Sequence, residues 1–240
     1  MIYGSRGKIG LITPAPGDST EYEFHKALPI GVSMLTTRMP IEAGTVESLS
    51  KLADYAEEGA SLLAVGKPKL IIFGSTAGSY IKGIGYDKQI ISRIEKHVGI
   101  PAITISTAVI EALKAVKAKK VSIASPHTDE VNQRAQAFIE GNGFQVTSTK
   151  GLGLTVPYQV AHLDSDEMYK LAKQVVKDDP GADTVFITCT GLTVVPIIEP
   201  LEAEIKKTVI TSNQAAIWAA LRRINVKDHI KGFGVLGKIQ

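Results

Sequence analysis

The feature that most constrains this chain is an internal echo between its two halves. Three short apolar segments, each closed by small polar residues, occur in the first half and recur in the same order in the second. They read IGLITP (Ile9–Pro14), LIIFGSTAG (Leu70–Gly78) and IPAITISTA (Ile100–Ala108), then VSIASP (Val121–Pro126), VFITCTGL (Val185–Leu192) and KTVITSNQA (Lys207–Ala215). The period far exceeds that of a solenoid repeat. The echo indicates two pseudo-equivalent lobes, with chance similarity among strands of an α/β protein as the alternative.

Apolar runs of strand length alternate with longer segments that carry apolar residues at helical spacing. The expected strands are Lys8–Thr13, Leu70–Phe73, Ala102–Ile105, Val121–Ala124, Thr184–Thr188 and Thr208–Thr211. The expected helices are Val46–Ala64, Asp87–His97, Ala108–Val116, Thr128–Glu140 and Asp166–Val176. This alternation predicts an α/β fold of two pseudo-symmetric lobes, each a parallel sheet flanked by helices, with a cleft between them. We expect the first lobe to hold residues 1–113 and 214–240, and the second to hold residues 114–213.

Composition narrows the class of protein. The 240 residues carry a formal net charge of +3, and the lysines and arginines are spread along the chain, which argues against a nucleic-acid surface. No apolar run approaches the length of a membrane span, and no secretory signal pattern is present. The single cysteine excludes an internal disulfide and a multi-cysteine metal site. We therefore expect a cytoplasmic protein without metal or cofactor and with no membrane or nucleic-acid partner; its oligomeric state is left open.

The one cysteine lies at the end of a predicted buried strand. In Val185–Leu192, a run of β-branched and aromatic residues leads to Cys189, and Thr190 and Gly191 follow at once. Ligands of open α/β sheets bind outside the carboxyl ends of the strands, so the thiol occupies a candidate catalytic position. The pattern predicts a helix that begins at this turn, where free N–H groups and the helix dipole face the thiol. The alternative is a cysteine that serves as a small buried hydrophobic residue.

If the lobes face each other, a second turn opposes Cys189. Gly74, Ser75 and Thr76 follow the strand Leu70–Phe73 and would supply hydroxyl and backbone N–H donors from one side, with Thr190 and Gly191 on the other. Converging donors of this kind suit a small carboxylate or an enediolate. Ordinary helix capping is the alternative for Ser75 and Thr76.

Two further strand ends contribute candidates. Pro14 closes the first strand of the first lobe and is expected in the substrate pocket, and Ser125-Pro126-His127 closes the corresponding strand of the second. His127 can donate to a carboxylate or move protons near neutral pH, with a solvated loop histidine as the alternative.

Several familiar motifs are absent. The two G-x-G segments continue neither as a dinucleotide fingerprint nor as a P-loop, and there is no H-E-x-x-H pattern. No G-x-S-x-G elbow occurs, which argues against a serine hydrolase.

With these residues in view, the chain resembles the aspartate/glutamate racemase superfamily, whose two pseudo-symmetric lobes each place one turn in a shared cleft. Racemases and maleate isomerases of that superfamily typically carry a cysteine in each turn. Here Cys189 fills the second position, and Gly74 fills the first, or Ser75 if the register shifts by one. A glycine followed by small hydroxyl residues is similar to arylmalonate decarboxylase, as are the stretches Thr104–Arg134 and Cys189–Arg222.

The chain also departs from arylmalonate decarboxylase. That family has a tyrosine where His127 stands, its Thr-Ser pair is reversed here as Ser75-Thr76, and Thr190 replaces the first of two glycines after the cysteine. The AGSYIKG segment is one residue longer here. These departures bear on the choice of substrate more than on the class of reaction.

The resemblance implies a cofactor-independent decarboxylase of aryl- or alkyl-malonate acids. One substrate carboxylate would lose its water in an apolar pocket and leave as carbon dioxide. The resulting enediolate would be held by Ser75, Thr76 and N–H groups of both turns, and the Cys189 thiol would protonate the carbanion from one face. The alternatives are a maleate-type cis-trans isomerase or a racemase that uses one cysteine, and a carboxylate-binding protein without catalysis.

Overall fold

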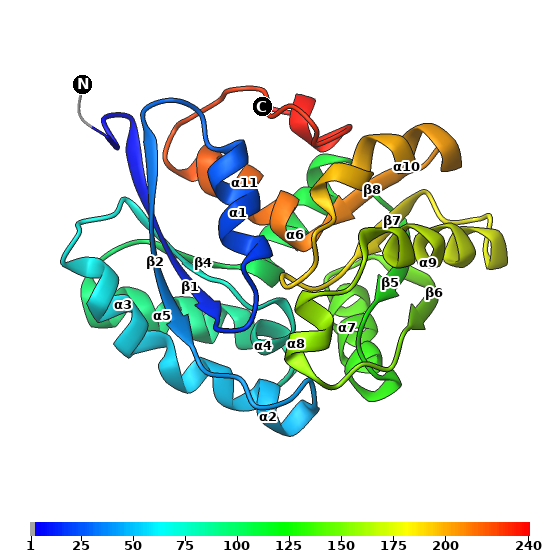
Figure 1. Cartoon of the computed structure of the whole chain (residues 1–240), viewed down its shortest axis with the longest axis horizontal. Coiled ribbons are helices and arrows are strands. Elements are labelled where there is room, and N and C mark those ends of the chain that lie inside the picture. Colours follow the sequence, from blue (N-terminus) through cyan, green and yellow to red (C-terminus); the bar gives the residue numbers. More distant parts are fainter. Residues whose placement is uncertain (1–2) are drawn as a thin grey trace.

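The structure, a computed structural model, describes residues 3–240 and contains two four-stranded parallel sheets (Figure 1). The strand order is β2-β1-β3-β4 in one sheet and β6-β5-β7-β8 in the other. The strands are β1 Gly7–Pro14, β2 Val32–Met39, β3 Leu70–Phe73, β4 Ala102–Thr104, β5 Lys120–Ser125, β6 Gln145–Gly151, β7 Thr184–Ile187 and β8 Thr208–Thr211. Corresponding strands occupy corresponding places, so the predicted α/β fold of two pseudo-symmetric lobes is confirmed.

Helices flank both sheets. They are α1 Ser19–Ala27, α2 Val46–Lys51, α3 Ala56–Ala64, α4 Thr76–Tyr80, α5 Tyr86–Val98, α6 Ile105–Ala115, α7 Asp129–Gly141, α8 Pro157–Ala161, α9 Ser165–Asp178, α10 Ile198–Ile205 and α11 Ser212–Arg223. The segment predicted as one helix over 46–64 is divided by a 3-10 turn at Leu52–Tyr55 into α2 and α3. No helix within residues 3–240 combines the length and apolarity that a membrane span requires.

The central strands β3 and β7 form because their sequences are apolar on both faces. LIIF and TVFI are buried along their whole length, as expected of strands covered by helices on both sides of a parallel sheet. Their register is set by the neighbouring strands: Ile9 of β1 lies opposite Leu70 of β3, and Val121 of β5 lies opposite Thr184 of β7.

The strand order places one crevice at the same point of each sheet. From β1 the chain runs first to β2 on one side and later to β3 on the other, and β5 is flanked in the same way by β6 and β7. Such a reversal of direction leaves a crevice at the carboxyl ends of the two central strands, where α/β proteins bind ligands. The residues that follow β1, β3, β5 and β7 are therefore positioned for function.

Helix α11 ties the lobes together. It follows β8 of the second sheet but packs against α6 and α1, which flank the first sheet (Figure 1). Thr211 caps it in a reciprocal capping box with Gln214. Because α11 lies against the first lobe, we propose that the lobes divide as expected, near residues 113 and 214.

Candidate active site

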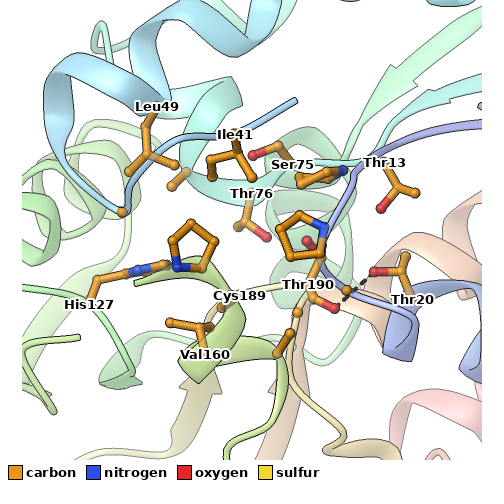
Figure 2. A pocket seen from close by; sticks show the side chains of 18 residues that line it. Thr13, Thr20, Ile41, Leu49, Ser75, Thr76, His127, Val160, Cys189 and Thr190 are labelled. Atoms are coloured by element: carbon orange, nitrogen blue, oxygen red, sulfur yellow. Dashed lines mark hydrogen bonds between the residues drawn. The ribbon is translucent and has the colours of Figure 1, made fainter. Parts of the chain in front are cut away.

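A cavity lies between the two lobes at the carboxyl ends of the central strands. It encloses about 580 Å³, part of it open to solvent, and Figure 2 shows Thr76, Cys189 and Val160 around its centre. The first lobe contributes Thr13, Pro14, Pro16, Gly17, Thr20, Ile41, Gly44, Leu49, Ser75, Thr76 and Ala77; the second contributes His127, Pro157, Val160, Ala161, Cys189, Thr190 and Gly191. The structure thus brings Pro14, Ser75, Thr76, His127, Cys189, Thr190 and Gly191 of the expected site together.

Cys189 reaches the cavity through an unusual backbone conformation. Strand β7 ends at Ile187, and Cys189 has a φ of 113°. Residues other than glycine disfavour this region of backbone conformation. Its N–H donates to Oγ of Ser212 at 3.0 Å. Strained residues of this kind persist where their surroundings over-determine them, and they cluster at functional sites.

The expectation that a helix begins at Thr190-Gly191 is wrong. A turn follows Cys189, a 3-10 turn covers Val195–Ile197, and α10 begins only at Ile198. The free N–H groups of a helix that begins at this turn therefore do not act on the thiol. Burial raises the pKa of the Cys189 thiol to about 11, against the smaller opposing effect of the Gly191 N–H. The group is a neutral thiol at neutral pH, which makes it a proton donor before it is a nucleophile.

Ser75 rather than Gly74 turns toward the cavity. Ser75 caps α4 by accepting a hydrogen bond from the Gly78 N–H at 3.1 Å, which leaves its own O–H free to donate. Gly74 does not line the cavity, and a Cβ added there would lie 2.5 Å from the Ile12 carbonyl oxygen. Gly74 instead offers its carbonyl to the Thr190 hydroxyl at 3.2 Å, a link between the two turns. The register with Ser75 in the first position is the one that the geometry favours.

Ser212 joins the turns on both sides of the cavity. Its Oγ accepts from the Thr76 hydroxyl at 2.9 Å and from the Cys189 N–H at 3.0 Å. It is the first residue of α11 and is fully buried. No local sequence pattern assigns Ser212 to the cavity, because its partners lie 23 and 136 residues away along the chain.

His127 is buried, so the alternative of a solvated loop residue is wrong. Its backbone N–H donates to Ser125 Oγ at 3.0 Å, and its ring lines the cavity opposite Thr13 and Ser75 (Figure 2). The Nδ1 atom has no hydrogen-bond partner among residues 3–240. Burial lowers the pKa of His127 to about 4, so the ring is neutral at neutral pH and can donate one N–H.

The walls of the cavity are largely apolar. Ile41 and Leu49 lie on one side and Val160 on the other, joined by the prolines and alanines of the lining (Figure 2). None of the lining residues is Lys, Arg, Asp or Glu. Within the described part of the chain, no group of three or more His, Cys, Asp or Glu residues is arranged to hold a metal ion.

Comparison with known proteins identifies a matching family and several relatives of this chain. A family model described as arylmalonate decarboxylase matches residues 9–237. Arylmalonate decarboxylase of Bordetella bronchiseptica is 23% identical over 222 residues, which cover 92% of each chain. Maleate isomerase of Pseudomonas putida KT2440 is 24% identical over 242 residues, with 95% of this chain and 96% of that protein covered.

Solved structures show the same fold. A cysteine-to-alanine variant of the maleate isomerase Iso from Pseudomonas putida S16, crystallised with maleate, has a TM-score of 0.91 at 20% identity, with 97% of each chain covered. An arylmalonate decarboxylase variant with one glycine changed to cysteine and one cysteine to serine has a TM-score of 0.90 at 22% identity, with 96% of this chain and 98% of that chain covered. With two such lobes, a shared cavity and a family match from residue 9 to residue 237, the chain belongs to the arylmalonate decarboxylase family.

Proposed function

We propose that this protein is a cofactor-independent decarboxylase of aryl- or alkyl-substituted malonates, and that Cys189 protonates the enediolate intermediate. The observation that carries the proposal is a lone, neutral thiol in an apolar cavity, with a serine rather than a second cysteine on the facing turn. A neutral thiol is suited to donate a proton, and one acid serves one face of a planar intermediate.

The cavity offers different surroundings to the two carboxylates of a malonate. Near Ser75, a carboxylate finds a free hydroxyl, and charge that develops there is held by a donor already in place, while the neutral His127 ring lies across the cavity. Against Leu49, Ile41 and Val160 it finds no donor, and its charge is desolvated. Desolvation favours the loss of charge, and carbon dioxide is neutral.

The chemical step needs no further reactant. The bond between the α-carbon and the desolvated carboxylate breaks, and carbon dioxide leaves. The electron pair stays on the α-carbon and is delocalised into the remaining carboxylate as an enediolate. The Cys189 S–H bond then breaks, its proton joins the α-carbon, and the thiolate recovers a proton from water. The raised thiol pKa favours this recovery because the thiolate is a strong base.

A maleate-type isomerase is the second candidate, since maleate isomerases are among the relatives of this chain. A cysteine-to-serine variant of the Nocardia farcinica enzyme carries a covalently bound succinylcysteine intermediate, so that enzyme has a cysteine for the adduct besides the one replaced. This chain has Cys189 alone. An adduct mechanism would have to use the residue that the proposal assigns to proton donation.

The two functions are separated by a direct assay. The purified protein is incubated with phenylmalonate, methylphenylmalonate and maleate. Carbon dioxide release is followed by a coupled bicarbonate assay, and fumarate formation is followed in parallel by proton NMR. The proposal predicts carbon dioxide from at least one malonate and no fumarate. Fumarate without carbon dioxide would establish the isomerase, and turnover of none of the three would contradict both.

A further inference from the structure

Glu23 is a buried residue of the first lobe whose carboxylate accepts hydrogen bonds from the segment of the second lobe that follows Cys189. It lies on α1 and is 4% exposed. One oxygen, Oε1, accepts from the backbone N–H groups of Val194 at 2.9 Å and Val195 at 2.8 Å. The other, Oε2, accepts from Nδ2 of Asn213 at 2.7 Å. A carboxylate of the first lobe thus holds the end of the turn that begins at Cys189.

The same network fixes the peptide next to Cys189. Asn213 Nδ2 donates both to Glu23 Oε2 and to the Thr190 carbonyl, the latter at 3.0 Å. The Thr20 hydroxyl, also on α1, donates to that carbonyl at 2.9 Å (Figure 2). Asn213 adjoins Ser212, the acceptor for the Cys189 N–H. The turn from 189 to 195 is therefore anchored at both ends by α1 and α11.

Cys189 needs such anchoring. Its φ of 113° is a conformation that a cysteine abandons when its neighbours are free to move. Relaxation would turn the thiol away from the cavity, because the direction of a side chain follows its backbone. We propose that Glu23 is a positioning residue that holds Cys189 in its strained conformation, with the thiol directed into the cavity.

The protonation state of Glu23 decides whether the network holds. The three donors at its carboxylate are neutral, and no charged side chain among the described residues shifts it; burial dominates and raises the pKa of Glu23 to about 7. Cys189 and His127 are the other ionisable groups of the site, and neither contributes to this shift. A protonated Oε2 would be an O–H donor that faces the NH2 group of the Asn213 amide, itself a donor. If the amide turned over to accept, its oxygen would also face the Thr190 carbonyl, and that bond would be lost.

The test uses the lone thiol as a reporter that needs no substrate. The rate at which iodoacetamide alkylates Cys189 is measured by mass spectrometry from pH 6 to pH 9 in the parent, Glu23→Ala and Glu23→Gln. Glu202→Gln is the matched control, because Glu202 also accepts from two backbone N–H groups, those of Val209 and Val235, but away from the cavity.

We expect alkylation in Glu23→Ala to be about tenfold faster than in the parent, because a released thiol is less buried and more acidic. In the parent, alkylation below pH 7 exceeds the rate set by thiolate fraction, since protonated Glu23 loosens the turn. In Glu23→Gln, whose amide places a donor against Asn213 at every pH and does not titrate, the excess is present across the whole range and no longer begins below pH 7, while Glu202→Gln behaves like the parent. On a malonate that turns over, Glu23→Ala lowers kcat about tenfold with KM unchanged, because Glu23 does not line the cavity.

The inference is overturned by a folded Glu23→Ala protein that alkylates at the parent rate. If Glu23→Ala does not fold, Glu23→Gln decides, and an excess that still appears only below pH 7 contradicts the inference. The outcome is distinguishable from that of the proposed function. A protein that decarboxylates no malonate but shows the alkylation changes refutes only the proposed function, and decarboxylation with an unaltered alkylation profile refutes only this inference.

Discussion

Cys189 has two properties that point to one chemical role. Its pKa of about 11 keeps the proton on sulfur at neutral pH, and its φ of 113° directs the side chain into the cavity from the end of a rigid strand. An acid at a fixed place protonates one face of a planar intermediate. A nucleophilic thiol would need the opposite shift, toward the thiolate.

The exchange Cys189→Ser tests this role. A hydroxyl of similar size keeps the shape of the cavity but is a far weaker acid, so turnover of a malonate should fall at least about 1,000-fold while binding changes little. Kinetics with methylphenylmalonate measure turnover, and calorimetry with the product 2-phenylpropionate measures binding. Activity within a few-fold of the parent would remove the thiol from the mechanism.

Positions 74 and 75 give a paired prediction. Ser75→Cys places a second thiol on the turn that faces Cys189, so it should racemise an optically pure 2-arylpropionate that the parent leaves unchanged, at the expense of about 1 kcal/mol for the lost cap. Gly74→Cys should instead destabilise the fold by about 1–3 kcal/mol, as at other overpacked sites, because its Cβ meets the Ile12 carbonyl at 2.5 Å.

Polarimetry and urea denaturation check the pair. Racemisation by a folded Gly74→Cys protein, with none in Ser75→Cys, would show that position 74 is the one that faces Cys189.

Among single residues, the sequence predicts the site residues that directly follow strands. Pro14, Ser75, His127 and Cys189 reach the cavity because the carboxyl ends of parallel strands meet at one edge of each sheet. Glu23 and Ser212 could not be found in this way. Most of their hydrogen bonds join α1 and α11 to residues that lie more than a hundred positions away along the chain. No local spacing in the sequence therefore predicts them.

At the scale of elements, strength of pattern decides what can be predicted. The six expected strands are all present, with ends that differ by one residue at most. Strands β2 and β6 were not expected. They lie at sheet edges, are mostly half-buried and include polar runs such as TTR and TSTK, so they lack the apolar signal of a covered strand. The helix after Cys189 begins late because Pro196 and the 3-10 turn delay it.

The N-terminus of α11 supplies an element-scale prediction. Ser212→Ala leaves the Cys189 N–H and the Thr76 hydroxyl without their shared acceptor, so the free energy of unfolding should fall by about 1–3 kcal/mol. Because the released N–H belongs to the strained residue, kcat should fall more than the stability loss alone would suggest. Thr107→Ala, which removes a hydroxyl bonded to Asp87 away from the cavity, is the control. Equal kinetics in both variants would contradict the role of Ser212.

At the scale of the whole molecule, two buried ionisable groups have opposite effects on how stability depends on pH. Glu23 belongs to the first lobe and His127 to the second, and burial shifts the pKa of each toward its neutral form: Glu23 from 4.5 to about 7, and His127 from 6.5 to about 4. The stability that neutral His127 contributes is present above pH 6.5 and is lost as the pH falls toward 4. Because the folded state holds the Glu23 proton more tightly than the unfolded state does, the contribution of this group to stability is greatest below pH 4.5 and is lost as the pH rises toward 7.

Between pH 4.5 and pH 6.5 the two dependences have opposite signs, each about 1.4 kcal/mol per pH unit, and offset each other. Relative to the parent, His127→Gln should therefore lose stability as the pH rises through this window, and Glu23→Gln should gain it. Urea denaturation of the three proteins at pH 4.5, 5.5 and 6.5 measures the differences. Two variants whose differences from the parent change in the same direction would contradict these shifts.

The most direct test of the account is the fate of the proton that Cys189 donates. Prochiral methylphenylmalonate is decarboxylated by the protein in deuterium oxide, and the product is examined by NMR and chiral chromatography. We predict one carbon dioxide for each substrate consumed, and a single enantiomer of 2-phenylpropionate with one deuterium at the α-carbon. A racemic product would contradict delivery of the proton by one fixed thiol, as would the same enantiomer formed at the parent rate by Cys189→Ser.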